Sequence, residues 1–68
     1  MTYFLTVSGN WRNAVRHPVM VSTDIETLRE IGLHYEGRGR AQVVEIYDAD
    51  WKLVETRTSH GWKAVAEL

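Results

Sequence analysis

The sequence predicts an α+β domain in which a mainly antiparallel sheet of about five strands, in ββαβββ order, packs one face against a single helix. Two observations carry this prediction. One stretch has the apolar spacing of an amphipathic helix, and two short segments rich in β-branched and aromatic residues precede it while three follow it. Short turns join the last three segments, which favours an antiparallel meander.

The strands are predicted from runs of β-branched and aromatic residues, at 3–8, 19–22, 42–47, 51–58 and 62–66. The second strand is expected to begin only after Pro18, because proline has no N–H to donate to a sheet. Residues 48–50 and 59–61 form the turns of the meander. Trp51 and Trp62 flank the last hairpin, and we expect them to pair across the strands in a structural role.

The predicted helix runs from Asp24 to about Glu36. Thr23 and Glu26 have the spacing of a capping box, with Thr23 as the N-cap. Gly32 is expected to cost about 1 kcal/mol relative to alanine, and Gly37 is placed to end the helix in a left-handed cap. Apolar residues recur every three or four positions along one helix face: Ile25, Leu28, Ile31 and Tyr35.

The composition indicates one folded domain, residues 1–68, with 44% hydrophobic and 25% charged residues. The chain contains no cysteine, which excludes disulfides, thiolate zinc sites and iron–sulfur clusters. A net charge of −1 gives no whole-molecule argument for nucleic acid or membrane binding. The first ten residues lack a basic segment and their apolar run is only 3–7, so we expect a cytoplasmic protein without a signal peptide.

Alternating chain direction gathers basic residues at one end of the predicted fold. The loop after the first strand and the loop after the helix both fall at that end. The candidate binding residues there are Arg12, Arg16, Arg38 and Arg40, for charge-assisted contacts, and Trp11, as a stacking anchor. The alternative is that Arg38 and Arg40 complement the negative C-terminal end of the helix and the other residues are solvated.

The sequence predicts no catalytic residue, no metal site and no cofactor. A cysteine nucleophile is absent, and none of the serines has the setting of a nucleophile elbow. His17, His34 and His60 are expected at the basic end, but they belong to three separate connections, so convergence on one ion is not expected.

A single helix covers one face of a sheet, which leaves apolar residues on the other face. The side expected under the helix carries Leu5, Val7, Val19, Val21, Val44, Ile46 and Leu53. The open side is expected to carry Phe4, Met20, Val43, Tyr47, Val54 and Val65. An exposed apolar patch of this kind marks an interface, such as a homodimer contact. The alternative is that a twisted sheet buries this face under the loop that contains Trp11 and Val15.

The whole chain resembles the small accessory proteins of bacteriophages. The resemblance rests on the start at Met1-Thr2, the lack of cysteine, and the strand–helix–meander order that ends in Gly61-Trp62-Lys63. Some phage anti-CRISPR proteins are similar in size and layout. The resemblance implies a non-catalytic protein that binds and modulates a host macromolecule.

Together, these observations predict a non-enzymatic interaction module that binds a host protein or nucleoprotein complex through its basic end. The alternative is a small nucleic-acid-binding protein that uses the same arginine-rich loops, in which case affinity falls steeply with salt. No membrane partner is expected.

Overall fold

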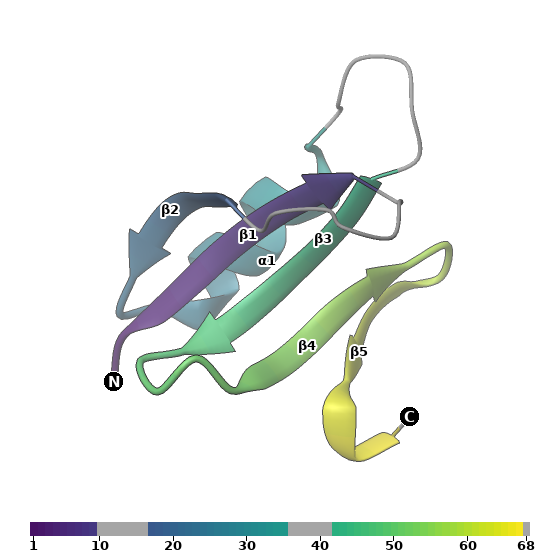
Figure 1. Cartoon of the computed structure of the whole chain (residues 1–68). Coiled ribbons are helices and arrows are strands. Elements are labelled where there is room, and N and C mark those ends of the chain that lie inside the picture. Colours follow the sequence, from purple (N-terminus) through teal and green to yellow (C-terminus); the bar gives the residue numbers. More distant parts are fainter. Residues whose placement is uncertain (10–16, 36–41, 68) are drawn as a thin grey trace.

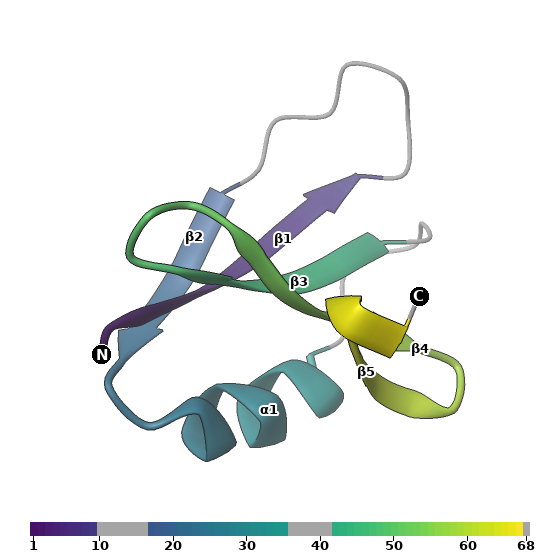
Figure 2. The same cartoon turned by 90° about the horizontal axis from the view of Figure 1, so that it is seen from below.

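The computed structural model describes residues 1–9, 17–35 and 42–67, and over these residues it confirms the α+β fold (Figure 1). The strands are β1 (Tyr3–Gly9), β2 (His17–Ser22), β3 (Gln42–Asp48), β4 (Leu53–Thr58) and β5 (Gly61–Ala64). The helix α1 (Ile25–Leu33) follows β2, and a short 3-10 helix η1 (Val65–Glu67) follows β5. These strands form an antiparallel sheet in the order β2-β1-β3-β4-β5. Figure 2 shows α1 on one face of this sheet.

The core lies between α1 and the two central strands. Leu5 of β1 lies opposite Ile46 of β3, and Val7 lies opposite Val44, so these four side chains share the face under the helix, as predicted. Leu28 of α1 completes the buried cluster. Half-buried apolar side chains pack around it: Tyr3, Ile25, Ile31, Tyr35, Val54 and Trp62.

The predicted faces are wrong for β2. Val21 lies opposite Phe4, on the open face, whereas Met20 lies opposite Leu5, on the helix face. A register shift between Leu5 and Thr6 leaves Val19 without a direct partner in β1. Valine and methionine are both apolar, so the sequence does not show which of them faces the helix. The pairing of β2 with β1 decides it.

A second register shift exchanges the predicted faces of two residues at the start of β4. Leu53 lies opposite Tyr47 on the open face, while Val54 packs against the core. The shift falls between Ile46 and Tyr47 of β3. An extra residue in one strand of a pair inverts the alternation of side chains on one side of the bulge. Strict alternation therefore predicts the wrong face for both residues.

The bounds of β2, β4 and β5 differ from the predicted ones. β2 begins at His17 and includes Pro18, because β2 is an edge strand and a proline there disrupts no ladder on its outer side. β4 begins at Leu53 rather than at Trp51, which turns out of the extended conformation. The final strand ends at Ala64, where η1 begins.

The N-cap of α1 is Asp24, not Thr23. Oδ1 of Asp24 accepts a hydrogen bond from the backbone N–H of Glu26 at 3.0 Å, and Oδ2 accepts one from Oγ1 of Thr27 at 3.2 Å. A carboxylate also interacts more favourably than a hydroxyl with the positive end of the helix. The Glu26 side chain instead pairs with Arg29. The capping-box prediction is therefore wrong by one residue.

α1 ends at Leu33 with His34 as C-cap, earlier than predicted. The predicted cap Gly37 lies outside the described residues. Arg57 of β4 reaches this end of the helix, where its Nη1 donates to the carbonyl oxygens of Gly32 at 2.6 Å and Tyr35 at 2.9 Å. The carbonyls of a last helical turn have no partner further along the helix, so Arg57 supplies a donor from the sheet to the Gly32 carbonyl and to the Tyr35 carbonyl just beyond the helix.

Replacing Arg57 with methionine is expected to lower the free energy of unfolding by about 1.5 kcal/mol. The aliphatic stem is kept, but two charge-assisted hydrogen bonds to the helix end are lost. Urea denaturation followed by circular dichroism measures the change. Arg57→Lys keeps the charge without the planar fork, so it should recover part of the loss; a methionine variant as stable as the wild type would contradict this role.

Candidate functional site

The residues predicted to bind a partner lie outside the described part of the structure; they are Trp11, Arg12, Arg16, Arg38 and Arg40. The described residues that flank these two segments do lie at one end of the sheet. Gly9 is opposite Gln42, and Val7 is opposite His17. The alternation of chain direction on which the prediction rests is thus confirmed for the described elements.

Arg57 and His34, two described side chains near the C-terminal end of α1, have contacts within the fold. Arg57 is bonded to the carbonyls of α1, which is a structural role. Nε2 of His34 lies 3.1 Å from Oε1 of Glu30, one helical turn earlier. Over residues 1–9, 17–35 and 42–67, no group of three histidine or acidic side chains is placed to hold a metal ion.

The turn between β3 and β4 places an aromatic side chain on the open face of the sheet. The N–H of Trp51 donates to the carbonyl of Asp48 at 3.0 Å, and the N–H of Asp48 donates to the carbonyl of Lys52, also at 3.0 Å. Oδ1 of Asp48 accepts from the N–H groups of Asp50 at 2.9 Å and Lys52 at 3.0 Å. This pattern is a tight turn followed by one left-handed residue, and that residue is Trp51, with φ of 58°.

A tryptophan is an unusual residue for a left-handed position. Its Cβ costs about 1–2 kcal/mol there, a cost that glycine avoids. The same chain uses glycine at its next hairpin, where Gly61 has φ of 103° and open space around it. The tryptophan at position 51 therefore needs a reason beyond the geometry of the turn.

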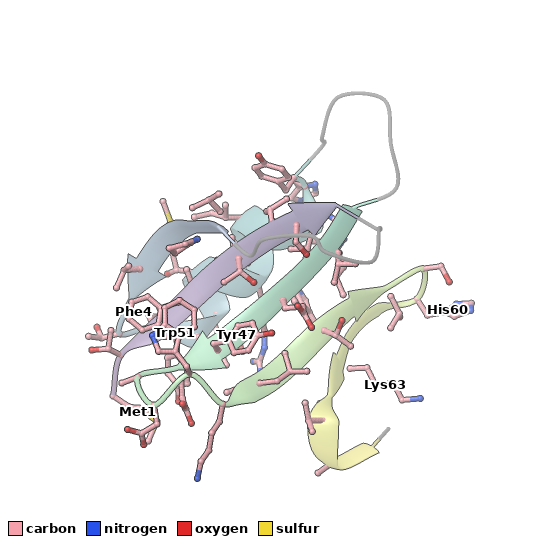
Figure 3. All side chains as sticks on the ribbon, in the orientation of Figure 1. Met1, Phe4, Tyr47, Trp51, His60 and Lys63 are labelled. Atoms are coloured by element: carbon pink, nitrogen blue, oxygen red, sulfur yellow. The ribbon has the colours of Figure 1, made fainter. Side chains whose placement is uncertain are left out.

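The Trp51 ring lies flat against Phe4 of β1. Their ring centroids are 4.9 Å apart and the rings are parallel to within 2°. Tyr47 of β3 adds a tilted contact at 5.7 Å. Figure 3 shows the three rings together at the end of the open face nearest to Met1. Tyr47 is only 7% exposed, whereas Trp51 remains 52% exposed although one face of its ring is covered.

The apolar surface continues from Phe4 to the edge of the sheet. Val21 of β2 lies opposite Phe4 and is 55% exposed. We name Phe4, Val21 and Trp51 the Trp51 surface. In this part of the open face, apolar side chains on neighbouring strands lie opposite each other and reach solvent.

The centre of the open face differs from the apolar patch that the sequence predicts. Thr6, Ser8 and Glu45 are buried there, as is Tyr47. Oγ1 of Thr6 donates to the backbone carbonyl of Glu45 at 3.3 Å, and the hydroxyl of Tyr47 donates to Oε1 of Glu45 at 3.2 Å. The exposed apolar area is therefore concentrated at the Trp51 end and along β2 rather than spread over the face.

Arg29 is the arginine that sequence reasoning left out, and it organises the helix face of β4. Its Nε donates to both carboxylate oxygens of Glu55, at 2.9 and 3.1 Å, and it also pairs with Glu26. The hydrogen bond to Glu55 is the main cause that raises the pKa of Arg29 above its ordinary value. Nε1 of Trp62 donates to the backbone carbonyl of Arg29 at 2.8 Å. These contacts join α1 to β4 and β5 and serve the fold.

The fold and the site thus define a small α+β domain with an aromatic surface on its open sheet face. Protein-family models, curated proteins and solved structures were compared with the chain, and none of them matches it. Within the described segments, α1 is too short and too polar to cross a membrane, and no other helix there is long enough.

Proposed function

We propose that this protein is a non-enzymatic interaction module that binds another macromolecule through the Trp51 surface. The observation that carries the proposal is the half-exposed tryptophan in a left-handed turn position, stacked on Phe4. A bulky residue at such a position is a backbone outlier, and outliers of this kind are concentrated at functional sites.

The covered face of the Trp51 ring stabilises the fold, whereas the exposed part of the ring is available to a partner. The left-handed conformation costs about 1–2 kcal/mol, and an aromatic pair contributes about 0.5–1.5 kcal/mol beyond the area that it buries. Burial of about half of the ring adds about 2–3 kcal/mol, so the covered half of Trp51 offsets the cost of the left-handed backbone, and the exposed half adds nothing to the fold. A rigid, half-exposed indole held by a second ring is, however, the type of side chain that dominates interface energies.

The class of target and the cellular location are proposed from the sequence alone. The resemblance to phage accessory proteins predicts a host macromolecule as the target. A cytoplasmic location is a separate prediction from the sequence. The arginines at 12, 16, 38 and 40, with Trp11, remain predicted binding residues at the basic end. Direct nucleic-acid binding through these loops remains the alternative prediction.

Trp51→Gly is expected to reduce capture of the partner at least tenfold while leaving the domain folded, since an interface tryptophan of this kind contributes about 2 kcal/mol or more. Glycine suits the left-handed backbone but loses the half-buried ring, so the free energy of unfolding should fall by about 1–2 kcal/mol, and capture is compared under conditions in which both proteins are folded. The measurement is affinity capture from a candidate host lysate, with urea denaturation of both proteins alongside.

The matched control is Leu33→Ala, which removes another exposed apolar side chain, on α1, without touching the Trp51 surface. It should capture the partner as the wild type does. Nuclease treatment of the lysate separates the two classes of target: loss of capture after nuclease favours the nucleic-acid alternative. Equal capture by Trp51→Gly and the wild type would rule out the Trp51 surface as the binding site.

A further inference from the structure

We infer that the Trp51 surface binds a segment of a partner protein in which a lysine or arginine side chain stands beside an apolar residue. This inference rests on the proposed function and adds the chemistry of the partner. It is carried by the juxtaposition of the exposed indole with acidic side chains at the same end of the sheet.

The acidic side chains are placed there by the strand register. Tyr3 lies opposite Ser22 on one side and Asp48 on the other, so the end of β2 and the end of β3 lie in one row across β1. Asp24 follows two residues after Ser22, and Asp50 lies in the turn that carries Trp51. Asp24 and Asp50 are exposed and Asp48 is half-exposed.

Three carboxylates therefore lie at the end of the sheet that carries the Trp51 surface, with Asp50 in the Trp51 turn and with Asp48 and Asp24 toward α1, since Asp48 shares the Tyr3 row and Asp24 caps the helix. Asp24 and Asp48 accept hydrogen bonds from backbone N–H groups, which orient the carboxylates but leave their charge in place. The nearby Glu26 is paired with Arg29. Among the described side chains of this turn, Lys52 opposes the two aspartates. A cationic group approaching the surface is thus attracted, and attraction over such distances is weakened by salt.

The indole offers a second interaction to the same cation. One face of the Trp51 ring is occupied by Phe4. A cation over the other face interacts with the ring quadrupole, and tryptophan is the best side chain for this. Asp50 precedes Trp51 in the chain and is exposed, so its carboxylate is available to the same cation. Val21, at the edge strand, provides the apolar contact for a neighbouring side chain of the partner.

The same charges argue against two other occupants. The phosphate backbone of a nucleic acid would be repelled by the aspartates. A second copy of the chain, docked face to face about a two-fold axis, would bring identical carboxylates together. A basic and apolar protein segment is the occupant that the charge and the exposed rings both favour.

The test is selection of a random peptide library, displayed on phage, against the full chain. Enriched peptides should carry lysine or arginine next to an apolar residue. A synthetic peptide from the enriched set is then titrated against the variants by calorimetry. Asp50→Lys should weaken binding about tenfold, because it reverses a charge next to the bound cation, and Trp51→Gly should weaken it at least as much.

Glu30→Lys is the control for net charge, since it makes the same change of charge on the exposed side of α1, away from the turn that carries Trp51, and it should leave peptide affinity unchanged. Enrichment of acidic peptides, no enrichment, or undiminished binding by Asp50→Lys would overturn the inference. The proposed function fails separately, if Trp51→Gly still captures the cellular partner. If binding of the partner is lost in Trp51→Gly but not in Asp50→Lys, the proposed function is supported and the inference of a basic segment is wrong.

Discussion

Replacing Arg29 with methionine is expected to lower the free energy of unfolding by about 3 kcal/mol. Glu55 is only 5% exposed, and Nε of Arg29 donates hydrogen bonds to both of its carboxylate oxygens. Removing one partner of a buried ion pair costs about 3–5 kcal/mol, because the other charge stays buried. The Arg29 side chain is 33% exposed, so solvent already screens the pair and the lower end applies.

The double variant Arg29→Met, Glu55→Met separates the cost of an isolated buried carboxylate from the value of the pair. Two apolar side chains of similar size replace both charges, and such replacements are often neutral. Urea denaturation of the two single variants and the double variant should show most of the loss recovered in the double variant. A double variant as unstable as Arg29→Met alone would show that the loss comes from packing of the Arg29 stem.

Gly32→Ala is expected to lower the free energy of unfolding by about 2 kcal/mol, although alanine favours a helix by about 1 kcal/mol. A Cβ at position 32 would stand 2.5 Å from Cζ2 of Trp62 and 3.0 Å from Cδ1 of Leu5. The Trp62 ring cannot move freely, because its Nε1 is bonded to the backbone of Arg29. Overpacking of this kind costs about 1–3 kcal/mol, which outweighs the gain in helix propensity.

The sign of the Gly32→Ala effect should reverse when the obstructing ring is smaller. In a Trp62→Phe background the ring atoms nearest to the new methyl group are absent, so alanine should be neutral or stabilising. Thermal denaturation of the four proteins in this double-mutant cycle measures the coupling. An equal cost of alanine in both backgrounds would show that the contact with Trp62 does not determine the requirement for glycine.

The requirement for Gly32 illustrates what periodicity misses. From the sequence, this glycine only weakens the helix. In the structure it is the point at which α1 approaches β5 closely enough for Trp62 to bond to the helix backbone. That approach depends on a partner thirty residues later in the chain, which no local pattern contains.

The Trp51 surface was partly predictable. The residues 48–50 indicate a turn, and Phe4 and Tyr47 were expected on the open face, where the register places them opposite each other. The run of β-branched and aromatic residues at 51–58 nevertheless predicts Trp51 in a strand, paired with Trp62. In the structure Trp62 lies opposite Arg57 and packs on the core, whereas Trp51 stacks on Phe4. The sequence contained one signal for this arrangement: the hairpin turn has tryptophan at the position where glycine is usual.

Local patterns in the sequence determined the order of the elements, the helix and its apolar face, and the antiparallel direction of the strands, because each depends on residues a few positions apart. The tertiary structure alone decided which residues of β2 and β4 face the helix, that Arg29 pairs with Glu55, and that Trp51 lies against Phe4. Those features depend on the register between strands distant in sequence, where a bulge of one residue exchanges the two faces of a sheet.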